Sequence, residues 1–179
     1  MQERTLVIVK PDAYVRGLTG EILGRLEQRG LVVEAIRVSR NEKETVGDHY
    51  PRSKEWLGTV GGKTLEDYAR LGISARDRLG TDDAAEIGQM VRTWLTEFLL
   101  SAPVVPMVIS GNRAIETVRK IVGHTLPVMA APGTIRGDYS SDSPDLANEE
   151  QRPVRNLVHA SGDPEEAERE IALWFPELA

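Results

Sequence analysis

Arg4-Thr5-Leu6-Val7-Ile8-Val9-Lys10-Pro11-Asp12 is the segment that decides the fold of this chain. The run from Thr5 to Val9 is β-branched and continuously apolar, which predicts a strand that is buried on both faces. Pro11 ends this strand, because proline lacks an N–H donor and disfavours helix at the residue before it. The chain therefore opens with a strand at the centre of its predicted core.

Working outward, the same kinds of signal predict the other regular elements. The expected elements are a helix from near Thr19 to Gly30, a strand over 31–38, a short polar helix over 43–50, an apolar strand over 103–109, a helix over 113–122 and a short strand over 154–158. A last helix begins at the N-cap Asp163, with Pro164 first and Glu166 at the capping-box position. This order predicts an α+β, ferredoxin-like (βαββαβ) antiparallel sheet covered by helices, with strand order assigned by analogy.

Two further segments interrupt that pattern. Gly58, Gly61 and Gly62 predict a loop, followed by a helical segment over 65–71. Asp82-Asp83 then caps an amphipathic helix whose apolar stripe is Ile87, Met90, Val91, Trp94, Leu95 and Phe98. Ser140 to Pro153 is polar and predicts an exposed excursion. The glycine-rich stretch 58–64 superficially resembles a phosphate-binding P-loop, but Leu57 stands where the pattern requires its first glycine.

The composition limits the classes of function. The chain has 179 residues, enough for one domain, and its net charge is −6, which argues weakly against nucleic-acid binding. It has no cysteine, which excludes a disulfide scaffold and a cysteine nucleophile. We find no signal-peptide pattern and no apolar stretch of bilayer length. The sequence predicts a soluble, cytoplasmic protein without a membrane or nucleic-acid partner.

The chain has three histidines, and His159 has the most suggestive surroundings. It follows the apolar pair Leu157-Val158 and precedes small residues and a well-capped helix, whose N-terminus would favour an anion. His49 and His124 are interpreted as ordinary surface or structural residues. From position alone, a structural role for His159 is as probable as a functional one.

Three cations add to this picture. Lys10 follows the first strand, Arg119 lies late in a helix, and Arg136 lies in a glycine-rich turn. Each alone is typical of a surface charge. Together with His159 they supply what phosphoryl transfer needs, namely positive charge, oriented donors and a nucleophile.

Several of these segments, in the same order, resemble the nucleoside diphosphate kinase family. They are Arg4–Asp12, Arg16-Gly17-Leu18 with Gly20-Glu21-Ile22, Pro103-Val104-Val105, Pro132–Asp138, Asn156–Ser161 and Glu165–Phe175. The resemblance implies an enzyme that transfers the γ-phosphoryl group of a nucleoside triphosphate (ATP, GTP) to a nucleoside diphosphate (ADP, GDP), by ping-pong kinetics and with low base specificity. It also implies a homo-oligomer.

The resemblance implies five catalytic residues. His159 would be the nucleophile, and Glu170 would orient its imidazole. Ser161 would bond to that carboxylate or lie near the histidine. Lys10 would contact the transferred phosphate, and Tyr50 would lie near the phosphoryl position.

The nucleotide would be held by a second set. Arg119, Thr125 and Arg136 would bind the β- and γ-phosphates, while Lys10 and Asn156 would contact the ribose hydroxyls. Mg²⁺ would be the cofactor, held by the nucleotide phosphates and not by direct protein ligands, as is usual for this ion.

The chain departs from the common family form in length. It is expected to form a single domain over residues 1–179, with a helical insertion of roughly thirty residues between Tyr50 and Ser101, at about 53–97. An extra loop of about ten residues lies at about 140–153. The insertion could be a nucleotide lid, a subunit contact or a helical pair with no chemical role. We favour a helical unit that buries its apolar stripe within itself, with a subunit interface as the second choice.

The chain also departs in composition near the site. No phenylalanine lies near Trp56 to Gly58, where the family places a base-stacking aromatic residue, so Trp56, Leu57 and Tyr68 are the alternatives. Ala160 replaces a preferred glycine, and Gly162-Asp163 replaces Asp-Ser. Two rival hypotheses are a nucleotide sensor without turnover and a structural oligomer with a vestigial site.

Overall fold

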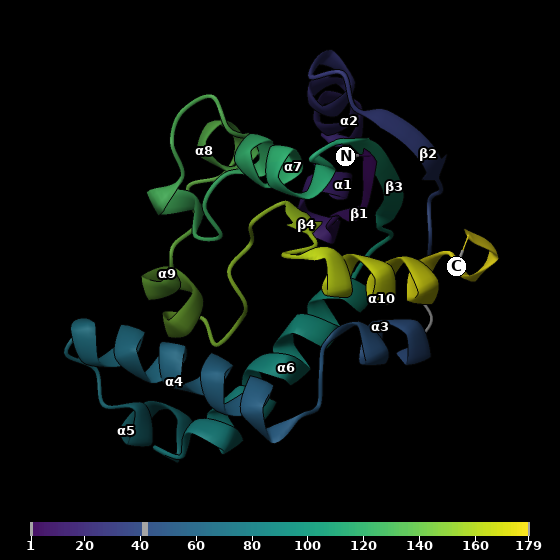
Figure 1. Ribbon diagram of the computed structural model, residues 1–179. Helices are drawn as coiled ribbons and strands as arrows, with labels where there is room; N and C mark the ends of the chain where they lie inside the picture. Colours follow the sequence, from purple (N-terminus) through teal and green to yellow (C-terminus); the bar gives the residue numbers. More distant parts are fainter. Residues whose placement is uncertain (1, 41–42, 179) are drawn as a thin grey trace.

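The computed structural model describes residues 2–40 and 43–178 and has a four-stranded sheet at its centre (Figure 1). Its strands are β1 Gln2–Val9, β2 Val32–Ile36, β3 Val105–Asn112 and β4 Val158–Ala160. They lie in the order β2-β3-β1-β4, and each neighbouring pair is antiparallel. This confirms the predicted α+β, ferredoxin-like fold.

Helices occupy most of the remaining chain. They are α1 Pro11–Val15, α2 Thr19–Gln28, α3 Lys43–His49, α4 Lys54–Arg70, α5 Ala75–Leu79, α6 Ala84–Leu100, α7 Ala114–Val122, α8 Ile135–Tyr139, α9 Pro144–Glu149 and α10 Pro164–Trp174, with short 3₁₀ turns η1 Pro127–Met129 and η2 Pro176–Leu178. The predicted helices α2, α3, α6, α7 and α10 are confirmed. None of the described helices is long and apolar enough to span a membrane.

The central strand β1 contributes to two cores, because successive side chains of a strand point to opposite faces. Val7 and Val9 pack against α2 and α7 on one face. Leu6 and Ile8 pack on the other face against α3, α10 and the end of α6. Burial on both faces explains why this stretch of sequence is continuously apolar.

The fourth strand lies later in the chain than predicted. The prediction placed it at 154–158, whereas the β4 ladder begins at Val158, opposite Val9. Leu157 has a positive φ of 69°, and the Val158 N–H donates to the Asn156 carbonyl across it at 2.7 Å. This tight turn keeps the preceding residues out of the sheet. His159 therefore lies in the middle of β4 and not beyond the end of a strand.

The predicted loop at Gly58, Gly61 and Gly62 is wrong, because all three residues lie inside α4. A Cβ on Gly61 would lie 1.7 Å from the Ala84 carbonyl oxygen, and one on Gly88 would lie 2.0 Å from the Leu57 carbonyl oxygen. Gly61 and Gly88 therefore let α4 and α6 cross in close contact. Because residues 58–64 are helical, they do not form a phosphate-binding loop.

The excursion at 140–153 is not simply exposed. It contains α9, in which Pro144, Ala147 and Asn148 are buried. The Tyr68 hydroxyl of α4 donates to the Asn148 carbonyl at 3.2 Å. Figure 1 shows α4, α5 and α9 together at the end of the molecule away from α2 and α7. The two departures from the common family length thus pack against each other.

Candidate active site

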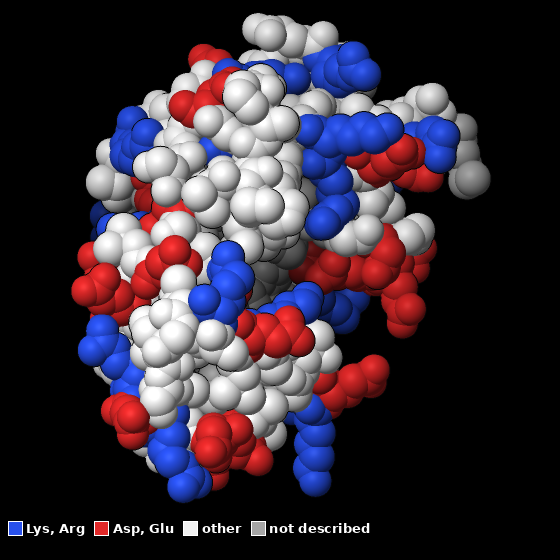
Figure 2. Space-filling view, turned by 90° about the vertical axis from the view of Figure 1, so that its left-hand side faces the viewer, with Lys and Arg blue, Asp and Glu red and all other residues white. Residues whose placement is uncertain are grey.

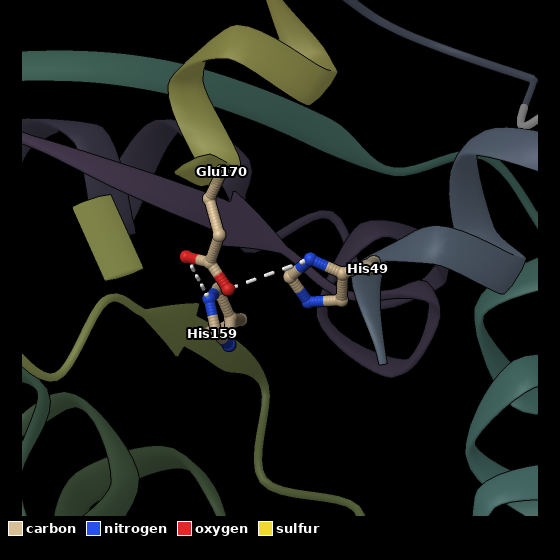
Figure 3. A group of neighbouring side chains, drawn as sticks. All are labelled: His49, His159 and Glu170. Atoms are coloured by element: carbon tan, nitrogen blue, oxygen red, sulfur yellow. Dashed lines mark hydrogen bonds and ion pairs between the residues drawn. The ribbon is translucent and has the colours of Figure 1, made fainter. Parts of the chain in front are cut away.

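His159 and Glu170 form the centre of the site (Figure 3). His159 pairs with Ile8 in the sheet, so its side chain points to the face that α3 and α10 cover. Nε2 of His159 lies 2.8 Å from Oε2 of the buried Glu170 on α10. Among the described residues, Nδ1 of His159 has no hydrogen-bond partner. The ring is thus held at one nitrogen, and its side chain is 19% exposed.

Ser161 fixes the carboxylate. Its hydroxyl is fully buried and donates to Oε2 of Glu170 at 2.7 Å. The Leu6 N–H donates to the same hydroxyl oxygen at 3.3 Å, which ties it to β1. Oε2 thus accepts from Ser161 and faces Nε2 of His159, as an ionised carboxylate oxygen can. The predicted proximity of Ser161 and Glu170 is found in the structure.

His49 belongs to this group, although the sequence indicated an ordinary residue. It is 2% exposed, its Nδ1 lies 3.5 Å from Oε1 of Glu170, and it accepts from the Trp174 indole N–H at 3.3 Å. Its ring meets that of His159 edge-on, with centroids 4.5 Å apart. The polar sequence of α3 concealed this, because the helix buries only its last turn and one stripe.

Lys10 and Asn156 form the next contact. The Lys10 ammonium donates to Oδ1 of Asn156 at 2.8 Å, and the Asn156 amide donates to the Thr125 carbonyl at 2.9 Å. Lys10 is buried, and burial together with the nearby Arg136 charge lowers its pKa to about 8. Lys10 therefore remains largely charged at neutral pH but loses its proton far more readily than a surface lysine.

Arg136 connects the chain segments around the site. Its guanidinium donates to the carbonyls of Asn156 at 3.0 Å, Gly123 at 3.0 Å and Val158 at 2.6 Å. The predicted turn around it is partly helical, since it lies on α8. Burial and the charge of Arg119 lower its pKa to about 10, so it stays a cation at neutral pH.

Arg119 and Thr125 lie at the edge of the site and are exposed. Arg119 donates to the Ala160 carbonyl at 3.5 Å, next to His159. Both residues line a cavity of about 900 Å³ beside the start of α10. Figure 2 shows the left-hand side of the view in Figure 1, which is hollowed near its middle and has basic and acidic side chains interspersed around the hollow.

Tyr50 lies next to His49, with ring centroids 4.9 Å apart, and it is buried. Burial, and then the Glu170 carboxylate, raise the pKa of its phenol, so the hydroxyl keeps its proton. Of the three possible base-stacking residues, Trp56 lies near Tyr50, at 6.3 Å between ring centroids. Tyr68 is buried in the core between α4 and α6 and is therefore not available to a base.

Asp12 is a second residue that sequence reasoning missed. Its Oδ2 accepts from the N–H of Leu157, the residue with positive φ, at 3.0 Å. Its Oδ1 is buried without a hydrogen-bond partner among the described residues. The sequence marked Asp12 only as the end of a strand, and no local pattern indicated a contact with a residue so distant in the chain.

The charges around His159 favour a neutral imidazole over a metal centre. Burial, and then the Lys10 ammonium, lower the pKa of His159 below the usual imidazole value, so the ring is neutral at pH 7. One atom each of His49, His159 and Glu170 lie within 4.8 Å of one another, a donor set that zinc accepts. The surrounding cations oppose a metal ion there, and the Trp174 N–H occupies the Nδ1 lone pair of His49.

The family model for nucleoside diphosphate kinase matches residues 3–56 and 86–179. The chain belongs to the nucleoside diphosphate kinase family. It is 54% identical to a nucleoside diphosphate kinase from Pyrobaculum aerophilum over 175 residues, which cover 98% of this chain and 96% of the relative. A relative from Saccharopolyspora erythraea is 38% identical, over 99% of this chain and all of the relative. The predicted family and phosphotransferase class are confirmed.

Solved structures of nucleoside diphosphate kinases agree. A crystal structure of the Pyrobaculum aerophilum NDP kinase has a TM-score of 0.96 and 52% identity, covering 98% of this chain and 96% of that one. A transition-state mimic from Borrelia burgdorferi, with bound vanadate and ADP, has a TM-score of 0.76 and 32% identity, covering 97% and 87%. Residues 57–85, outside the family model, include most of α4 and all of α5.

Proposed function

We propose that this nucleoside diphosphate kinase transfers the γ-phosphoryl group of a nucleoside triphosphate to a nucleoside diphosphate through a phosphohistidine on Nδ1 of His159. The observation that supports this most directly is the 2.8 Å contact between Nε2 of His159 and Glu170. A proton on Nε2 that is donated to this carboxylate leaves the Nδ1 lone pair free. The low pKa of the ring keeps that lone pair unprotonated at neutral pH.

In the first half-reaction, the Nδ1 lone pair attacks the γ-phosphorus. The N–P bond forms as the bond from the γ-phosphorus to the bridging oxygen breaks, and the diphosphate leaves with that electron pair. The imidazole becomes positively charged, and Glu170 stabilises it. In the second half-reaction, a terminal oxygen of another diphosphate attacks the phosphohistidine, which gives ping-pong kinetics.

The cations and polar groups act on the phosphates and ribose. Lys10, Arg119 and Arg136 reduce the repulsion among the phosphate oxygens in the transition state, Thr125 assists in phosphate binding, and Asn156 and Lys10 contact the ribose. Tyr50 contacts the ring of His49, which in turn contacts the ring of the nucleophile His159. It adjoins the position of the transferred phosphoryl group. These contacts do not involve the base, which supports low base specificity.

Mg²⁺ is the proposed cofactor. Of the charged groups that act on His159, Lys10, Arg136 and Arg119 are cations and Glu166 is an anion. This mainly cationic set fits phosphate oxygens better than a protein cage for a metal. The ion would therefore be held by the nucleotide phosphates and water, where it neutralises phosphate charge.

A homo-oligomer and a cytoplasmic location are part of the same proposal. The sheet ends at β2, whose apolar side chains Val32 and Ile36 are 56% and 46% exposed. An edge strand with such a surface is suited to contact a second copy.

The proposal is tested with Mg²⁺, γ-labelled ATP and purified protein, with His159→Ala alongside. We expect acid-labile, alkali-stable label on the wild type alone, and transfer of that label to GDP or a pyrimidine diphosphate. Nucleotide binding without label would contradict the proposal and favour a sensor. No thermal stabilisation by nucleotide would favour a structural role.

A further inference from the structure

The C-terminal end of α3 carries His49 and is followed at once by Tyr50, so its position determines where both side chains lie beside His159. The last carbonyl groups of a helix have no partner within the helix and carry partial negative charge. In α3 these carbonyls are reached by side chains from two other helices. The end of α3 is therefore held by tertiary contacts and not by its own short sequence.

Arg92, on α6, makes most of these contacts. Its Nε donates to the Tyr50 carbonyl at 3.2 Å, and its Nη2 donates to the Gly47 carbonyl. The guanidinium suits this task because it presents several donors in a rigid plane and can hold two acceptors at once. A single side chain thus spans the turn that joins α3 to the site.

Arg169, on α10, contacts the same turn from another side. It donates to the Asp48 carbonyl at 3.4 Å and lies 3.5 Å from Oε1 of Glu170. Arg169 thus lies on α10, the helix that also carries Glu170. Arg92 lies on α6, the helix that crosses α4. The position of α3 relative to β4 depends on both.

We propose that Arg92 is a positioning residue, which links the α4–α6 hairpin to the active site by fixing the end of α3 and with it His49 and Tyr50. This inference rests on the proposed function, and it gives α6, which packs against the inserted α4, a role in catalysis. Arg92 touches neither His159 nor Glu170 in any described contact, so it would act only through α3.

The experiment measures phosphorylation of His159 in a single turnover with γ-labelled ATP and Mg²⁺, for wild type, Arg92→Ala and Arg92→Lys. We expect Arg92→Ala to lower the maximal rate on the order of tenfold, since two charge-assisted hydrogen bonds are lost. The ATP concentration at half-maximal rate should change far less, because the phosphate-binding side chains are intact. Arg92→Lys should fall between the two, because one ammonium cannot hold both carbonyls as a fork does.

Two controls separate positioning from a general loss of stability. Arg76→Ala removes an exposed arginine that pairs with Asp82 in the same hairpin, and it should leave the rate unchanged. Millimolar guanidinium should restore the rate of Arg92→Ala, whereas sodium chloride at equal ionic strength should not.

A wild-type rate in Arg92→Ala would overturn the inference. So would a slow rate that guanidinium does not restore, because that would indicate only a weakened fold. No label on the wild type would overturn the proposed function itself, and this role of Arg92 with it.

Discussion

Nε2 of His159 and Oε2 of Glu170 are 2.8 Å apart, and the Ser161 hydroxyl donates to the same carboxylate oxygen at 2.7 Å. In the proposed mechanism this relationship gives the two ring nitrogens different tasks. Nε2 would carry the proton and donate it to Glu170, which would leave Nδ1 free to react. The buried carboxylate would also compensate the positive charge that the ring gains on attack.

Glu170→Gln should therefore slow phosphorylation of His159 on the order of 100-fold, because a glutamine amide can donate to Nε2 and stabilise the wrong tautomer. Ser161→Ala should cost less, about tenfold, the value of one hydrogen bond to a charged group. Single-turnover labelling measures both rates. Equal rates in wild type and Glu170→Gln would show that the carboxylate does not set the tautomer.

The pKa of Lys10 predicts a pH dependence. This pKa is lowered to about 8, so the ammonium is present below that pH and is lost as the pH rises through it. We expect kcat/KM for ATP to fall above about pH 8, because kcat/KM reports the free enzyme. If kcat/KM stayed constant up to pH 10, the reaction would not require a charged Lys10.

Asp12→Asn provides the matched control for Lys10. The Asp12 carboxylate raises the pKa of Lys10, and asparagine keeps an oxygen that can accept from Leu157. The alkaline fall should therefore move to lower pH in Asp12→Asn. A shift of this fall to higher pH would contradict the assignment of the fall to deprotonation of Lys10.

Sequence patterns predicted the sheet and most of its helices because those elements bury regular apolar stripes. The sequence also predicted the capping residues of α10. The Glu166 carboxylate, however, accepts from the Gly162 N–H, whereas a capping box would use the N–H of the N-cap residue Asp163. The α4–α6 crossing was not readable. A glycine that permits close packing and a glycine that forms a loop look alike until the partner helix is known.

That crossing makes a stability prediction. Gly88→Ala should lower the free energy of unfolding by about 1–3 kcal/mol, because its Cβ would meet the Leu57 carbonyl and force the helices apart. Gly62→Ala, in the same hairpin with nothing within 4 Å of the new Cβ, should be stabilising by about 0.5–1 kcal/mol. Urea unfolding measures both, and the same sign in both variants would contradict the close crossing.

Only those residues of the candidate site that lie in family motifs could be predicted from the sequence. Lys10, Asn156, His159 and Glu170 come together in the structure as the resemblance implied. His49 and Asp12 were missed because their partners, Trp174 and Leu157, lie more than a hundred residues away along the chain. Long-range contacts of single polar residues leave no periodic pattern in a sequence.

A double-mutant cycle tests the buried contact of His49. His49→Phe keeps a ring but leaves the Trp174 N–H without its acceptor, which should lower the free energy of unfolding by about 1–3 kcal/mol. Adding Trp174→Phe removes the orphaned donor, so the double variant should be more stable than the sum of the two single losses predicts. Strictly additive losses would mean that the two side chains do not interact.

The most direct test of the account is the position of phosphorus on the ring of His159. Nuclear magnetic resonance of the phosphoenzyme, made with Mg²⁺ and ATP and kept alkaline, distinguishes phosphate on Nδ1 from phosphate on Nε2. The contact of Nε2 with Glu170 predicts phosphorus on Nδ1 of His159 and no signal in His159→Ala. Phosphorus on Nε2, or on another residue, would contradict the central claim.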